Sequence, residues 1–348
     1  MHHHGRHREH PPGARGLRRP EDDPLAADPL QGLPQPQLPG TGMGVTWLNP
    51  PQEVGPLPNP GRFSDSVTGV EVGQPVAVHP AELVGDGRLP DRIAGRTNLY
   101  PRVRYFGSAA FDPHTDGGFC QLKAVRAEQL RPLPDGVSTK HGALAEPLAV
   151  AMHAVDRAGV VRGREVLVNG AGPIGSLVVA AAKYAGAASV IAADLTDSSL
   201  AVARAMGADE LRNVASGGTL PDDVDLVFEA SGAPAALGPV LRATARGGTM
   251  VQVGNLPGAA VPAALGDLVT RKIIWIGSYR FVDEITDALV AMQQVLDVAP
   301  LITHTFGIDR AAEALAVAAD RGSGSGKVML RLDADAERTT RRRRSPAG

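Results

Sequence analysis

The sequence is poor in cysteine and aromatic residues, and its acidic and basic residues almost balance. Cys120 is the only cysteine among 348 residues, which excludes an internal disulfide framework. A formal net charge of −2 at pH 7 gives no electrostatic reason to expect a nucleic-acid or membrane partner. No apolar run approaches the roughly 20 residues of a membrane-spanning helix, and no secretory signal pattern is visible. We therefore predict a cytoplasmic protein that is long enough for two domains.

Large aliphatic residues are scarce at both ends of the chain. Residues 1–64 hold 13 of the 29 prolines, together with several histidines and no apolar periodicity. Such a composition cannot offset its ordering entropy by burial, so we predict that this segment is disordered or comes from a misread start of the reading frame. Residues 335–348 contain a run of four arginines and are predicted to form a second disordered tail.

An apolar run followed by a glycine-rich turn is the strongest local pattern. Residues 166–168 predict a buried strand, and Gly170, Gly172 and Gly175 then follow the spacing G-x-G-x-x-G before a helical segment at 174–184. In this motif the first glycine permits a sharp turn and the second lets a pyrophosphate approach the backbone. The third lets the helix pack closely on the strand. The pattern predicts a dinucleotide site at the start of the helix.

Asp194 follows the next predicted strand, residues 189–193. A carboxylate at this point can accept hydrogen bonds from the adenosine ribose hydroxyls and would repel a 2′-phosphate. We therefore predict NAD as the cofactor, with NADP less favoured.

Strands and helices alternate after the fingerprint. Helices are predicted at 198–206 and 235–245, and strands at 226–229, 249–253 and 273–277. This alternation is typical of an α/β fold with a doubly wound parallel sheet, so we predict a Rossmann dinucleotide-binding domain over residues 147–284.

The flanking segments predict a second, β-rich domain built from residues 65–146 and 285–334. Strands are expected within 67–80, at 117–125 and at 328–332, with a loop at 86–104. Helical character is expected at 140–158, 283–296 and 311–319.

Several further motifs, in order along the chain, resemble the zinc-dependent medium-chain dehydrogenase/reductase family, in its sorbitol (polyol) dehydrogenase branch. They are Arg104-Tyr-Phe-Gly-Ser, Pro113-His-Thr-Asp-Gly-Gly, Ala145-Glu-Pro-Leu, Val251-Gln-Val-Gly and Gly277-Ser-Tyr-Arg-Phe. The resemblance implies that the β-rich part is an incomplete GroES-like catalytic domain. It also implies reversible hydride transfer between a nicotinamide and a secondary alcohol of a polyol or sugar acid, aided by zinc, in a homo-oligomer (dimer or tetramer).

The same resemblance implies roles for individual residues. Contacts to the cofactor are expected beyond the glycines and Asp194, from Pro173, Ile174, Val253, Gly254, Asn255, Tyr279 and Arg280. Arg280 and Phe281 are expected to contact the substrate. Glu146 matches one of the family's zinc ligands.

The rest of the family's zinc chemistry is missing from the sequence. No Gly-His-Glu motif occurs, and Cys120 has no ligand spacing and is interpreted as a small buried core residue. The four cysteines that hold a structural zinc in relatives are replaced by Asp86, Leu89, Arg92 and Tyr100. Because a catalytic zinc normally has three protein ligands, the set left in this chain is incomplete.

Three functions therefore remain open. The first is an NAD-dependent polyol or sugar-acid dehydrogenase, impaired by the missing zinc ligands. The second is a zinc-free quinone or enone reductase of the same superfamily, against which the Glu146-Pro-Leu motif argues. The third is a homologue that binds NAD without catalysis.

Overall fold

The computed structural model describes residues 45–48, 69–71, 73–120 and 122–332. The predicted tails, 1–64 and 335–348, lie outside the described residues except for residues 45–48. Every described residue belongs to the compact unit Gly40–Gly348.

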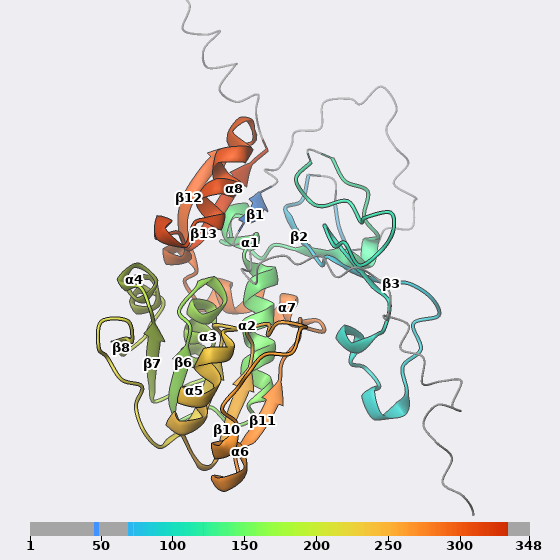
Figure 1. Cartoon of the computed structure of the whole chain (residues 1–348). Helices are drawn as coiled ribbons and strands as arrows, with labels where there is room; N and C mark the ends of the chain where they lie inside the picture. The colour runs from blue at the N-terminus through green and yellow to red at the C-terminus, as the bar shows by residue number, and fades with distance from the viewer. Residues whose placement is uncertain (1–44, 49–68, 72, 121, 333–348) are drawn as a thin grey trace, which may run out of the picture. The chain divides into compact units, whose positions relative to one another are not determined.

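The largest sheet of the described residues has six strands, and all of them run parallel (Figure 1). In spatial order the strands are β11 (Ile274–Gly277), β10 (Thr244–Gln252), β9 (Val224–Glu229), β6 (Glu165–Asn169), β7 (Ser189–Asp194) and β8 (Glu210–Asn213). The chain winds outward from β6 to β8 and then returns to continue from β9 to β11. This is the doubly wound order of a Rossmann fold, so the predicted fold class is confirmed.

Both faces of the sheet are covered, because alternate residues of its strands enter different apolar clusters. Val166 and Val168 belong to a cluster that includes residues of α2 (Ala145–Arg157), α3 (Pro173–Tyr184), α4 (Asp197–Ala205) and α7 (Glu284–Gln294). Leu167 belongs to a second cluster, with residues of α5 (Leu237–Ala243) and α6 (Gly266–Thr270). The unbroken apolar run of β6 is explained by this burial on two sides.

The remaining strands form smaller sheets. β2 (Val76–Val78) pairs with β5 (Leu130–Pro132), and β3 (Ala81–Leu83) pairs with β4 (Val103–Tyr105), both antiparallel. A parallel sheet has the order β1 (Val45–Leu48), β13 (Lys327–Arg331), β12 (Ile302–Gly307), and α8 (Ala311–Ala319) packs on it. Single turns of 3₁₀ helix lie at Asp91–Ile93, Thr97–Leu99, Ala127–Gln129, Pro234–Ala236, Ala299–Leu301, Ile308–Arg310 and Arg321–Ser323.

Three sequence-based expectations differ from the structure. The helix predicted at 140–158 is divided into two helices, α1 (Thr139–Gly142) and α2. Ala143 and Leu144 lie at the junction between them. No strand occurs among the described residues of 117–125; Leu122 is 68% exposed, so this segment buries no apolar face. β1 lies within the segment predicted as disordered, where its β-forming sequence pairs with β13.

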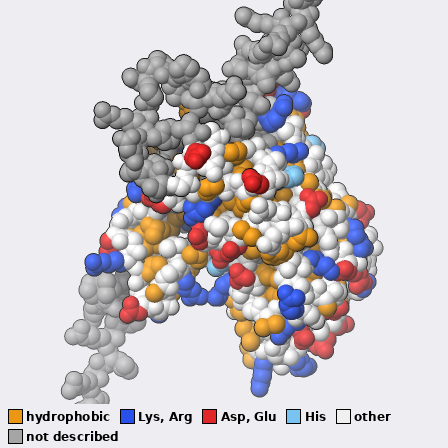
Figure 2. Space-filling view, turned by 180° about the vertical axis from the view of Figure 1, so that it is seen from behind, with side chains coloured by type: hydrophobic (Ala, Val, Ile, Leu, Met, Phe, Trp, Pro, Cys, Tyr) orange, Lys and Arg blue, Asp and Glu red, His pale blue; other side chains and the backbone are white. Residues whose placement is uncertain are grey.

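No helix in the described ranges combines the length and the apolar character that crossing a membrane requires. Acidic and basic side chains are intermingled on the face of the molecule shown in Figure 2.

Candidate cofactor and substrate site

The glycine-rich turn joins β6 to α3 with the geometry that the sequence predicted. Gly170 has φ 94°, a conformation that favours glycine, and its N–H donates to the Ala193 carbonyl over 2.8 Å. A Cβ on Gly175 would collide with the carbonyl oxygen of Gly170, whereas one on Gly172 would meet no protein atom within 4 Å. Gly175 therefore serves close packing, and Gly172 borders open space at the start of α3.

The start of α3 beside Gly172 has the features expected of a pyrophosphate site. Pro173 is the first residue of α3 and has no N–H to leave unsatisfied, and the first-turn N–H groups of Ile174 and Gly175 lie at the positive end of the helix. The buried hydroxyl of Ser176 donates to the Ala171 carbonyl over 2.9 Å and stabilises the turn. These features are the ones by which helix N-termini bind phosphate groups.

Asp194, the last residue of β7, lies directly beside this turn. Its Oδ2 accepts the N–H of Ala171 over 2.7 Å, and its Oδ1 accepts the N–H groups of Leu195 and Thr196 over 2.7 and 3.0 Å. The next residues, up to Leu200, include no lysine or arginine that could neutralise a 2′-phosphate. The structure therefore brings the predicted acid and the predicted glycines together.

A row of polar residues ends three adjacent strands where the winding direction changes. Asn169 of β6, Glu229 of β9 and Gln252 of β10 are in register with one another. Glu229 is fully buried, and its Oε1 accepts Asn169 Nδ2 over 3.2 Å while its Oε2 accepts Gln252 Nε2 over 2.5 Å. From the sequence, Glu229 could be either an ordinary loop acid or a neighbour of the nicotinamide ribose. The polar ends of three apolar strands were a further signal for its position.

The segment after β10 was predicted to contact the cofactor. The N–H groups of Val253 and Gly254 both donate to the backbone carbonyl of Glu229, over 2.8 and 2.9 Å. These two N–H groups hold the segment, with Asn255 after it, against the end of β9. A cofactor contact from Val253 or Gly254 would therefore use other backbone atoms, such as carbonyl oxygens.

Tyr279, Arg280 and Phe281 follow β11 in a sharply bent segment. Arg280 has φ 54°, and its guanidinium lies over the ring of Tyr105 at 4.6 Å and over that of Tyr279 at 4.9 Å. Phe281 is only 3% exposed and packs against His79, with ring centroids 4.9 Å apart. Arg280 is thus placed beside aromatic side chains, whereas Phe281 forms part of the core.

His153 and Glu284 hold this bent segment in place. His153 Nδ1 lies 2.6 Å from Glu284 Oε1, and Glu284 Oε2 accepts the N–H of Val282 over 2.6 Å. Burial alone would raise the pKa of Glu284, but the hydrogen bonds from His153 and the backbone lower it overall. On the other side, Asn98 donates to the Tyr279 carbonyl over 2.7 Å.

Glu146, the expected metal ligand, lies in the first turn of α2 and accepts a hydrogen bond of 2.6 Å from the hydroxyl of Tyr105. Burial and the adjacent Glu146 raise the pKa of Tyr105 well above its usual value. Both residues line a cavity of about 490 Å³, together with Lys327, whose pKa burial lowers and Glu146 acts to raise. The apolar walls of this cavity include Val76, Phe106 and Ile285.

The zinc ligand set does not fit within the described part of the chain. There, no group of three or more His, Cys, Asp and Glu side chains could hold a metal ion. At the positions of the structural zinc, the Tyr100 hydroxyl donates to Asp86 Oδ1 over 3.4 Å, while Arg92 is exposed. Cys120 is half-exposed, so its interpretation as a buried core residue was wrong.

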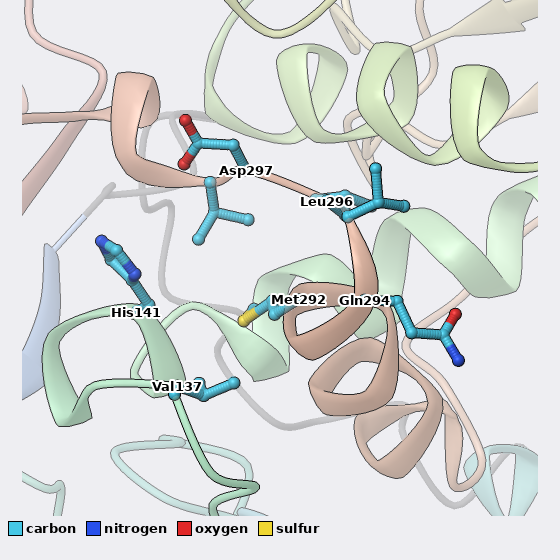
Figure 3. Close-up of a pocket in the computed structure, with 9 residues that line it drawn as sticks. Val137, His141, Met292, Gln294, Leu296 and Asp297 are labelled. Carbon is cyan, nitrogen blue, oxygen red and sulfur yellow. The ribbon is translucent and has the colours of Figure 1, made fainter.

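A smaller cavity, of about 210 Å³, lies between the loop before α1 and the turn after α7. Figure 3 shows His141, Met292 and Asp297 around it. None of the predicted site residues lines this cavity. We therefore place the candidate site at the glycine-rich turn and the adjacent carboxyl ends of β9 and β10.

Comparison with known proteins shows which proteins this chain is similar to. Residues 173–294, from α3 to α7, match the protein family described as "Zinc-binding dehydrogenase". L-idonate 5-dehydrogenase (NAD(P)(+)) of Escherichia coli K12 is 36% identical over 269 residues, which are 74% of this chain and 76% of the relative. Sorbitol dehydrogenase of Gallus gallus is 34% identical over 289 residues, 78% and 77% of the two chains.

A solved structure gives the same result for the fold. The crystal structure of L-idonate 5-dehydrogenase from Escherichia coli has a TM-score of 0.70 to this chain at 36% sequence identity. The similarity covers 75% of this chain and 76% of that one.

Proposed function

Because the chain belongs to the zinc-binding dehydrogenase family, we propose that it is an NAD-dependent dehydrogenase of the L-idonate 5-dehydrogenase type. Its substrate is the secondary alcohol of a sugar acid or polyol, the class to which the relatives' names point. The observation that carries the proposal is the pairing of Ala171 with Asp194 beside the open position at Gly172.

The cofactor, when bound, supplies the carbon that exchanges a hydride with the substrate. The pyrophosphate is held at Gly172 and the N–H groups of Ile174 and Gly175, and the adenosine ribose at Asp194. Val253–Asn255, at the end of β10, would hold the nicotinamide half. Tyr279 and Arg280, after β11, would contact the cofactor from the neighbouring strand.

On the substrate side, Arg280 can bind a carboxylate or sugar hydroxyls through its planar, always charged guanidinium. The Tyr105 hydroxyl donates a hydrogen bond to Glu146, so the hydroxyl proton is held between these two side chains at the wall of the larger cavity. Phe281 supports the Arg280 segment from the core, and a direct contact with substrate remains a prediction for it.

No step through zinc follows from these residues. Glu146 is one family ligand, and a catalytic zinc normally has three. Described residues supply no second and third ligand around it. The same observation favours the metal-free alternatives, an enone or quinone reductase and a non-catalytic NAD-binding homologue, which the experiment below separates.

The test combines metal analysis, cofactor binding and turnover of the purified full-length chain. We expect NAD to raise the melting temperature and L-idonate or sorbitol to be oxidised with NAD reduction. About one zinc per subunit would mean that residues outside the described ranges complete the site. Quinone reduction without alcohol oxidation would replace the proposal by the reductase function. NAD binding without any turnover would replace it by the non-catalytic function.

The assembly state is part of the same proposal. Family resemblance predicts a homo-oligomer, dimer or tetramer, and light scattering of the purified chain measures it directly.

A further inference from the structure

Glu229 is a buried carboxylate for which the proposed chemistry has given no role. It is fully buried at the end of β9, and no described lysine, arginine or histidine forms an ion pair with it. A buried charge without an opposite charge is costly unless hydrogen bonds satisfy it. The retention of such a charge at the centre of the sheet calls for a physical explanation.

Hydrogen-bond geometry shows the carboxylate to be fully satisfied as an anion. Oε1 accepts the N–H of Ser231 over 2.9 Å as well as Asn169 Nδ2, and it also contacts the Ser231 hydroxyl. Oε2 accepts the N–H of Gly232 over 3.2 Å as well as Gln252 Nε2. Both oxygens thus accept from N–H groups, which can only donate. This is the bonding pattern of an ionised carboxylate, held without a neutralising cation.

Glu229 ends β9, next to the end of β6, where a dinucleotide is expected to bind. Ligands of doubly wound sheets bind at the carboxyl ends of the strands, where the winding direction changes. Here that point lies between β6 and β9. With the pyrophosphate at the start of α3 and the adenosine ribose toward Asp194 on β7, the nicotinamide nucleotide must extend over the ends of β9 and β10.

The nicotinamide ring is the part of the cofactor whose charge changes during the reaction. It is cationic when oxidised and neutral when reduced, so a fixed negative charge below it distinguishes the two forms. Charges interact more strongly in a poorly solvated interior than in water. We propose that Glu229 is an electrostatic positioning residue that selectively stabilises the oxidised, cationic form of the bound nicotinamide. This assignment rests on the proposed function, in that the chain must bind NAD.

The first test replaces the charge and keeps the shape, by Glu229→Gln. Dissociation constants for NAD⁺ and NADH are measured at fixed ionic strength, NADH by its fluorescence and NAD⁺ by competition with it. We expect NAD⁺ to bind on the order of tenfold more weakly relative to NADH, as for unit charges about 10 Å apart at an effective dielectric constant of about 20. If Glu229 had only a structural role, its replacement would weaken the binding of both cofactor forms by the same factor, and that result would overturn the assignment.

A second pair of variants leaves Glu229 in place, because Glu229→Gln puts an amide among donors and can fail to fold. Gln252→Lys brings an ammonium to Oε2 of Glu229, whereas Gln252→Leu removes the same donor without adding charge. We expect the lysine variant to weaken the binding of NAD⁺ relative to that of NADH. The leucine variant should leave the ratio of the two dissociation constants unchanged. The same ratio of NAD⁺ to NADH dissociation constants in both variants would refute the electrostatic role. If the unaltered chain binds neither form, the proposed function itself fails and the assignment with it.

Discussion

The backbone N–H of Ala171 donates to Oδ2 of Asp194 over 2.7 Å, which joins the glycine-rich turn after β6 to the acid that ends β7. Oδ1 of the same carboxylate is bonded to the N–H groups of Leu195 and Thr196. The acid is therefore fixed in position before any ligand arrives. Preorganisation of this kind lowers the entropic cost of binding.

Replacement of Asp194 by asparagine should change cofactor preference. Asp194→Asn removes the negative charge that accepts ribose hydroxyls and repels a 2′-phosphate, while it keeps the side-chain size. We expect NAD⁺ affinity to fall about tenfold, the loss of roughly one charge-assisted hydrogen bond, and NADP⁺ affinity to fall less or to rise. Titration with both cofactors measures this.

The matched control is Asp197→Asn. Asp197 is the first residue of α4, and its Oδ1 accepts a hydrogen bond from Asn213 Nδ2 over 2.6 Å. It has the same charge as Asp194 and lies near it in sequence, but it does not border the glycine-rich turn. Equal effects of the two variants on the NAD⁺ to NADP⁺ ratio would contradict the role of Asp194.

Two glycine variants should separate binding from folding. Gly172→Ala adds a methyl group that meets no protein atom within 4 Å, so the melting temperature without cofactor should stay unchanged. The same methyl group occupies the expected pyrophosphate position, and NAD should no longer raise the melting temperature. Gly175→Ala collides with the Gly170 carbonyl and should cost about 1–3 kcal/mol of stability. Thermal melts with and without NAD test both expectations. A Gly172→Ala protein whose melting temperature NAD still raises would contradict the first, and a Gly175→Ala protein as stable as the unaltered chain would contradict the second.

Replacement of Arg280 by glycine should leave the fold intact. Because Arg280 has φ 54°, Arg280→Gly relieves a backbone conformation that glycine adopts easily, and stability should be unchanged or higher. Loss of the guanidinium should raise KM for L-idonate about tenfold or more, and KM for sorbitol less, since only a carboxylate offers a bidentate ionic partner. Steady-state kinetics with both substrates checks this; equal increases would argue against carboxylate binding by Arg280.

Stability should depend on Glu284 in a pH-dependent way. The pKa of Glu284 in the folded state lies below its ordinary value of 4.5. The ionised side chain therefore contributes to the free energy of unfolding above pH 4.5, and this contribution is lost as the pH falls through the folded-state pKa. The unaltered protein should exceed Glu284→Gln in unfolding free energy by about 1–2 kcal/mol at neutral pH. The difference should vanish in acid, as measured by urea unfolding at a series of pH values.

Asp156 supplies a control of opposite sign. Burial and the nearby Glu284 raise the pKa of Asp156, so its ionised form opposes folding at neutral pH. Asp156→Asn should therefore stabilise the protein near pH 7, and the gain should disappear as pH falls below the raised pKa. A loss of stability at neutral pH would show that hydrogen bonds of Asp156, and not its charge, dominate.

The parts of the fold that could be predicted depend on local signals. β6, the turn with Gly172, and α3 follow one another within a short stretch, and each has its own pattern of apolar run, glycine spacing and helix start. The strand predicted at 117–125 was wrong because alternation alone does not provide a pairing partner or a buried face. The division between α1 and α2 was missed because alanine and leucine at the junction favour a helix.

By itself the sequence determined the doubly wound domain, the place of the dinucleotide fingerprint and the acid that follows it, since these depend on neighbours along the chain. Only the tertiary structure placed Tyr105 against Glu146, β1 against β13, and Asn169 and Gln252 around Glu229. These pairs join residues far apart in sequence. Their register is set by packing of the whole sheet and its helices, and no local pattern specifies which polar group meets another.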